Sequence, residues 1–121
     1  MFDHVFLNVS DKEKSSKFYT AILKALGVGP QLDTEQYTAY GTDESYLFWL
    51  HAEGSEGATR NMHLALSAPS RKSVDEFYRA GLASGGKSNG EPGLRPEHGE
   101  SYYAAFLLDP DGNNIEAVCY K

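Results

Sequence analysis

The sequence repeats itself at a spacing of 59 residues, the distance from His4 to His63, and this repeat restricts the fold more than any other feature. One matching position would carry little weight, but several match at once. They are His4 with His63, Phe18 with Phe77, Tyr19 with Tyr78, Ala21 with Ala80, Leu23 with Leu82 and Gly27 with Gly86. The pattern indicates a duplicated module that contains a strand, a helix and further strands.

The first copy has the pattern of a strand followed by an amphipathic helix. Residues 2–9 place Val5, Leu7 and Val9 on one strand face. A helix is expected over about 11–26, with Ser10 as its N-cap, Glu13 completing a capping box and Gly27 ending it. Further strands are expected at Gln36–Tyr40 and Tyr46–His51, with a turn over 41–44 and a polar, glycine-rich linker over 53–60.

The second copy follows the same order. It predicts a strand at Asn61–Ser67, a helix of about 71–84 capped by Ser70, a long loop over 87–101, and a hairpin of Tyr102–Leu108 and Asn114–Tyr120 around an Asp-Pro-Asp-Gly turn. A loop of that length in a small domain is often functional. We therefore expect one α+β domain over 1–121, made of a module of about 1–54 and a module of about 61–121.

Composition limits the classes of function. A chain of 121 residues with a net charge of −6 is too small for two independent domains and too acidic for a broad nucleic-acid surface. It has no apolar run long enough to span a membrane and no signal peptide, and its single cysteine cannot form an internal disulfide. These features predict a cytoplasmic protein that binds a small molecule and no membrane.

Glu116 is a carboxyl group inside a mostly apolar strand, so it needs a partner. His4 and His63 occupy equally apolar strands. Two imidazoles and a carboxylate suffice for a divalent ion such as Zn, Ni, Mn, Co or Fe(II), with positions left for water or substrate. The alternative is that each histidine is a hydrogen-bonded core residue and that Glu116 pairs with a nearby base or tyrosine.

The whole chain resembles the vicinal oxygen chelate superfamily, also called the glyoxalase, bleomycin-resistance and dioxygenase superfamily. The resemblance rests on His4 in Asp-His-Val-Phe-Leu-Asn-Val, on the two Phe-Tyr helices, on His63 in Asn-Met-His-Leu-Ala-Leu, and on the segment from Phe106 to Glu116. It implies two βαβββ modules that form a paired, curved mixed sheet around a cavity. It also implies a metal held by His4, His63 and Glu116, and a homodimer.

One departure from the family pattern restricts the reaction. Where glyoxalase I supplies an additional acidic ligand from its first module, this chain has Trp49, which cannot ligate a metal. The usual glyoxalase I activity is therefore not expected, unless His51 substitutes. The remaining three ligands resemble those of extradiol dioxygenases and of fosfomycin-modifying thiol transferases.

Strand parity and loop position suggest which residues surround the site. Glu116 and His98 are candidates for proton transfer, and Arg95 for binding an anionic group. The predicted substrate-binding residues are Phe6, Asn8, Trp49, Arg95, Tyr102 and Phe106. Each aromatic residue is alternatively a packing residue, and Arg95 and His98 are alternatively solvated surface.

The leading hypothesis is a metal-dependent enzyme of lyase, isomerase, thiol transferase or dioxygenase type that acts on a small oxygenated molecule. The ion would act as a Lewis acid or, if it is iron, position dioxygen. The competing hypothesis is a metal-free protein that sequesters a cationic, planar drug-like molecule in an aromatic cavity.

Overall fold

The computed structural model describes all residues, 1–121, as two modules of one helix and four strands each. The first contains β1 (Val5–Val9), α1 (Lys12–Ala25), β2 (Gly29–Asp33), β3 (Tyr37–Gly41) and β4 (Phe48–Ala52). The second contains β5 (His63–Ser67), α2 (Arg71–Ala83), β6 (Lys87–Leu94), β7 (Tyr103–Leu108) and β8 (Asn114–Cys119). The α+β fold expected from the sequence is confirmed.

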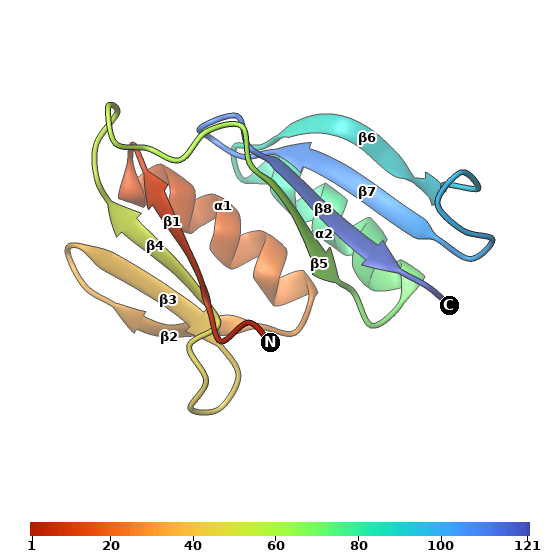
Figure 1. Ribbon diagram of the computed structural model, residues 1–121, viewed down its shortest axis with the longest axis horizontal. Coiled ribbons are helices and arrows are strands. Elements are labelled where there is room, and N and C mark those ends of the chain that lie inside the picture. Colours follow the sequence, from red (N-terminus) through yellow and green to blue (C-terminus); the bar gives the residue numbers. More distant parts are fainter.

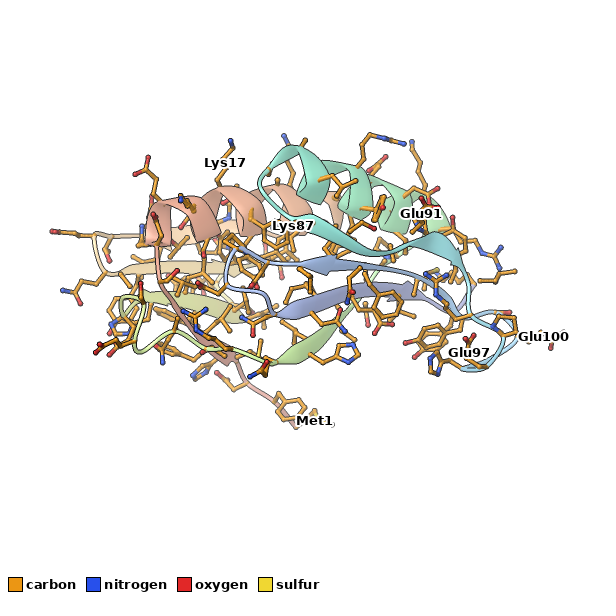
Figure 2. The ribbon with its side chains drawn as sticks, turned by 90° about the horizontal axis from the view of Figure 1, so that it is seen from above. Met1, Lys17, Lys87, Glu91, Glu97 and Glu100 are labelled. Carbon is orange, nitrogen blue, oxygen red and sulfur yellow. The ribbon has the colours of Figure 1, made fainter.

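Each module forms its own mixed sheet. The strand orders are β1-β4-β3-β2 and β5-β8-β7-β6, with a parallel first pair and antiparallel pairs thereafter. Both helices lie on the same side of the sheets and pack against one another, which leaves the opposite sheet faces uncovered by helices (Figures 1 and 2). No helix in the chain is long and apolar enough to cross a membrane.

Two strands differ from the expectation. β2 was not predicted, and the predicted loop over 87–101 is wrong for residues 87–94, which form β6. Both are edge strands that contain a proline, Pro30 or Pro92, and both are mostly exposed. Proline and glycine suppress the strand pattern, whereas an edge strand tolerates them because one side of its backbone needs no partner. The register of β6 against β7 shifts twice around Gly90.

The helix starts also test the sequence prediction. Ser70 caps α2, as expected, by accepting a hydrogen bond from the backbone of Ser73. The N-cap of α1 is Asp11 and not Ser10, because the Ser10 backbone and hydroxyl both donate to Asp111 in the other module. The Ser10 side chain, which the local capping pattern assigned to the helix, therefore bonds a residue of the other module instead.

The core lies between the helices and the sheets. Its fully buried aromatic residues include Phe18 and Phe77, which occupy equivalent positions in the two helices. α2 packs closely against the core at the buried Gly81. An added Cβ there would lie 2.2 Å from Leu107 Cδ1 and 3.1 Å from Ile22 Cγ2. A side chain at that position would push the second helix away from both its own sheet and the first helix.

The turn between β7 and β8 connects the modules. Buried Asp109 accepts hydrogen bonds from the Tyr19 hydroxyl, at 2.6 Å, and from the backbone amides of Asp111 and Asn113. Burial, followed by the charge of Asp109, raises the pKa of Tyr19 well above its usual value. Tyr19 therefore stays a neutral donor that ties α1 to the second module.

The repeat supplies a matched test of this contact. We expect Tyr19→Phe to lower the free energy of unfolding by about 1.5–3 kcal/mol, because it removes a donor from a buried carboxyl group. Tyr78→Phe removes the equivalent hydroxyl of the second module, which bonds the exposed Ser88, and we expect a loss below about 1 kcal/mol because water replaces it. Urea unfolding of both variants measures the difference, and equal losses would contradict the role assigned to Tyr19.

Candidate metal and substrate site

Glu116 is the most unusual side chain of the second sheet. It lies on β8, between the neighbouring strands β5 and β7, and only 2% of its surface is exposed. Its neighbours across the strands are Ala65 and Phe106. A carboxyl group at the centre of a sheet is costly unless polar partners compensate for its lost hydration.

Two side chains supply those partners. His63 Nε2 lies 2.8 Å from Glu116 Oε1, and the Tyr102 hydroxyl donates to Glu116 Oε2. The tyrosine partner agrees with the alternative prediction, in which Glu116 pairs with a nearby base or tyrosine. The carboxyl group raises the pKa of Tyr102 from 10.0 to about 12, mainly through this hydrogen bond, and burial adds to the shift.

Other predicted site residues gather around this centre. The ring of Phe106 lies 6.3 Å from that of His63, and the Arg95 guanidinium lies 5.4 Å from the centroid of Phe106. The ring of His98 lies 5.2 Å from that of Tyr102. His98 belongs to the loop between β6 and β7, and the acidic residues Glu97 and Glu100 of that loop lie at the far end of the second module (Figure 2). Strand parity was correct for Tyr102 and Phe106: the Tyr102 hydroxyl bonds Glu116, Phe106 is paired with Glu116, and their neighbours Tyr103 and Leu107 contact α2 instead.

The first sheet carries a separate group of predicted residues, which we call the first-module group: His4, Phe6, Asn8 and Trp49. His4 Nδ1 lies 2.7 Å from Asp3 Oδ1, and His51 Nδ1 lies 3.2 Å from Asn8 Oδ1. His4 and Trp49 help to line a hollow of about 450 Å³ that is formed by the first module alone.

A single chain does not bring the first-module group to Glu116. β1 and β5 run in opposite directions in Figure 1, so that His4, just before β1, and His63, at the start of β5, lie at opposite ends of the paired sheets. Accordingly, no three His, Cys, Asp or Glu side chains of the chain are close enough together to hold a metal ion. The three-ligand set remains a prediction that this chain by itself does not assemble.

The strand register supports the prediction that Trp49 occupies, in the first module, the position that Glu116 occupies in the second. Trp49 is paired with Phe6 of β1, and Glu116 is paired with Ala65 of β5, which is the repeat equivalent of Phe6. The two side chains therefore occupy corresponding positions of the two modules. His51 is two residues further along and is held by Asn8 and by Glu53, whose Oε2 lies 3.2 Å from His51 Nδ1.

Two of the three predicted ligands have a spacing compatible with one divalent ion. The His63 nitrogen and Glu116 oxygen are 2.8 Å apart, and two ligands bound to one ion at about 2.1 Å each lie roughly 3 Å apart. Imidazole and carboxylate suit the first-row metals and zinc. The distance between His63 Nε2 and Glu116 Oε1 is therefore compatible with two ligands of one ion as well as with the hydrogen bond, and the chain groups no third such ligand beside them.

Sequence reasoning missed two aromatic side chains of the first module. Tyr37 stacks on His51, with ring centroids 4.7 Å apart and an interplanar angle of 20°. Tyr46 lies 5.7 Å from Trp49, and its carbonyl accepts a hydrogen bond from the indole. Parity along β3 and β4 could have placed Tyr37 beside His51. Tyr46 precedes β4 and has no parity to follow.

Comparison with known proteins identifies the family. The profile of the Glyoxalase/Bleomycin resistance protein/Dioxygenase superfamily matches residues 1–117. A Vibrio cholerae protein named "Probable lactoylglutathione lyase" is 31% identical over 132 residues, which cover 98% of this chain and 89% of that protein. The chain therefore belongs to the Glyoxalase/Bleomycin resistance protein/Dioxygenase superfamily.

Solved structures agree with this assignment. A glyoxalase/bleomycin resistance protein from Albidiferax ferrireducens is 36% identical, with a TM-score of 0.81 over 98% of this chain and 97% of that chain. A glyoxalase-related enzyme from Fulvimarina pelagi is 20% identical, with a TM-score of 0.73 over 98% of this chain and 86% of that chain, and it shows the shared fold alone.

The Tyr102–Glu116 hydrogen bond predicts a specific pH dependence. The pKa of Tyr102 is higher in the folded than in the unfolded protein, so its stabilising effect is complete below about pH 10 and is lost as the pH rises through about 12. The difference in unfolding free energy between the wild type and Tyr102→Phe should therefore shrink over that range.

Urea unfolding at a series of alkaline pH values measures this difference. Tyr120→Phe is the control, because Tyr120 packs against the Tyr102 ring but its hydroxyl makes no hydrogen bond in the structure. A Tyr102→Phe difference that stays constant up to pH 12 would show that its hydroxyl does not hold Glu116 in solution.

Proposed function

We propose that this protein is a divalent-metal-dependent enzyme that acts on a small oxygenated molecule. The observation that supports the proposal most directly is the pair of His63 Nε2 and Glu116 Oε1, 2.8 Å apart, with Glu116 almost fully buried in the middle of the second sheet. His4 is the third proposed ligand, and it would come from a second copy of the chain.

The arrangement of the modules supports a site shared between two copies. A twofold-symmetric dimer can place the first module of one copy over the second module of the other, and symmetry then makes two identical sites. The faces that would meet are uncovered by helices and carry exposed aromatic residues, among them Phe6 at 47% and Tyr120 at 66% exposure. Burying such side chains favours association.

The proposed site residues would have separate roles. When bound, a divalent ion supplies Lewis acidity to a substrate oxygen. Glu116 is held by the Tyr102 hydroxyl, while Arg95, whose guanidinium lies over the Phe106 ring and donates to the Glu91 carbonyl, would bind an anionic group. His98, in the loop beside Tyr102, is exposed and is the candidate for exchanging protons with solvent.

Trp49 bears on the type of reaction. The position that corresponds to Glu116 in the first module offers no metal ligand, so the proposed site has three protein ligands. Three ligands leave more positions for substrate oxygens than four. We therefore infer a reaction other than the usual lactoylglutathione lyase reaction, although the Vibrio cholerae relative carries that name.

Mixing two inactive variants tests both the ligands and the shared site. We expect His4→Ala and His63→Ala each to abolish stoichiometric Co(II) binding by a protein purified without a metal-affinity tag. If the two variants are mixed and their subunits exchange, half of the dimers are mixed and each restores one of its two sites, so about one quarter of the wild-type Co(II) content should return. Metal analysis after gel filtration measures the content.

His98→Ala is the matched control and should retain the full Co(II) content, because His98 contacts the Tyr102 ring and belongs to no group of three possible ligands in the chain. Loss of metal in each variant with no recovery on mixing would place the site within one copy. A wild-type dimer that binds no Co(II), Zn(II), Ni(II), Mn(II) or anaerobic Fe(II) would refute metal dependence.

A further inference from the structure

The hollow of the first module combines aromatic walls with acidic groups. Tyr46 and Trp49 form two of its walls, with ring centroids 5.7 Å apart and planes inclined by 70°. The Trp49 indole donates a hydrogen bond to the Tyr46 carbonyl, at 3.2 Å, which fixes the ring in this position. The two rings therefore meet edge to face, and both belong to the lining of the hollow.

The hollow has more acidic than basic side chains around it. Asp3 and Glu44 line it, no lysine or arginine does, and the one basic side chain of the lining, His4, lies with its Nδ1 2.7 Å from Asp3 Oδ1. An anionic ligand would be repelled by these carboxylates, whereas a cation would be attracted. The aromatic faces add to the attraction, since the ring quadrupole presents negative charge to a cation above the ring.

The size of the hollow distinguishes an organic cation from a metal ion. Asp3, His4 and Glu44 all line it, yet no three such side chains of the chain are close enough together to hold a metal. A volume of about 450 Å³ accommodates a ligand much larger than one ion. The exposed, apolar Leu47 adds a further surface for alkyl groups.

We propose that this hollow binds an alkylammonium group, such as a quaternary or tertiary amine, against the Tyr46 and Trp49 rings and beside Asp3 and Glu44. Binding of that group requires no metal. Its part in the reaction does rest on the proposed function: in the shared site, His4 would bring the hollow next to the metal, and the ammonium group would anchor the substrate at the end away from its reacting oxygen.

The sequence offers a direct readout, because Trp49 is the only tryptophan. Metal-free protein in a chelating buffer is titrated with choline chloride at constant ionic strength, and the tryptophan emission is followed. We expect a saturable change at roughly millimolar choline, and binding at least about tenfold weaker for 3,3-dimethyl-1-butanol, the neutral isostere, because it lacks the charge.

Variants separate the contribution of the acidic side chains from that of the aromatic rings. Glu44→Gln should raise the choline dissociation constant about two- to fivefold, and Glu56→Gln, which removes an exposed charge outside the hollow, should leave it unchanged. Tyr46→Leu should raise it about three- to tenfold, whereas Tyr46→Phe keeps the ring and should restore wild-type binding.

Two results would overturn the proposal: no saturable change in the wild type, or equal affinity for choline and its neutral isostere. Co(II) content is measured on the same protein preparation in a separate experiment. Choline binding without Co(II) binding would refute the metal-dependent enzyme and leave the alkylammonium site standing. Co(II) binding without choline binding would do the reverse.

Discussion

The buried hydrogen bond between Tyr19 and Asp109 is the contact on which the arrangement of the two modules depends. Asp109 also organises the turn before β8 by accepting from two backbone amides, so one carboxyl group shapes the second sheet and holds the first helix. Next to it, Asp111 accepts from Ser10 at the end of β1. These contacts hold the first module against the second, where α1 packs beside α2. Both helices lie on one side of the molecule, and both open sheet faces, with Glu116 and Trp49, lie on the other side.

The fold was predictable because it is encoded twice. Equivalent Phe-Tyr pairs mark the two helices, alternation marks β1, and the Asp-Pro-Asp-Gly turn marks the hairpin of β7 and β8. β2 and β6 were missed for a common physical reason: an edge strand is partly exposed, hydrogen-bonds along one side only, and therefore tolerates prolines and glycines that normally indicate a loop. The wrong N-cap at Ser10 has a different origin, since a partner 101 residues away determines that side chain's role.

The candidate site was predictable within a module but not between modules. Parity correctly placed Tyr102 and Phe106 on the Glu116 face, because alternation along a strand is a local property. Whether His4 reaches the same ion depends on how one module is oriented against another, and the alternation of residues within a strand carries no information about that orientation. The contact between Tyr102 and Glu116 was predictable only in part. Parity placed both residues on one face of the sheet, but the approach of the Tyr102 hydroxyl to the carboxyl group depends on the path of the loop over 95–102.

The opposite directions of β1 and β5 have a consequence for how such a chain can change over time. On the open sheet faces, corresponding positions such as those before β1 and at the start of β5 lie at opposite ends of the paired sheets (Figure 1), although equivalent helix positions such as Ile22 and Gly81 lie close together. A substitution on one open face therefore leaves the environment of its counterpart intact. The duplicated halves were thus free to specialise, one toward aromatic and acidic groups around Trp49 and the other toward imidazole and carboxyl chemistry around Glu116. Each polypeptide then carries two unlike surfaces, and natural selection can change the aromatic and acidic one while Glu116 keeps its own-module neighbours His63 and Tyr102.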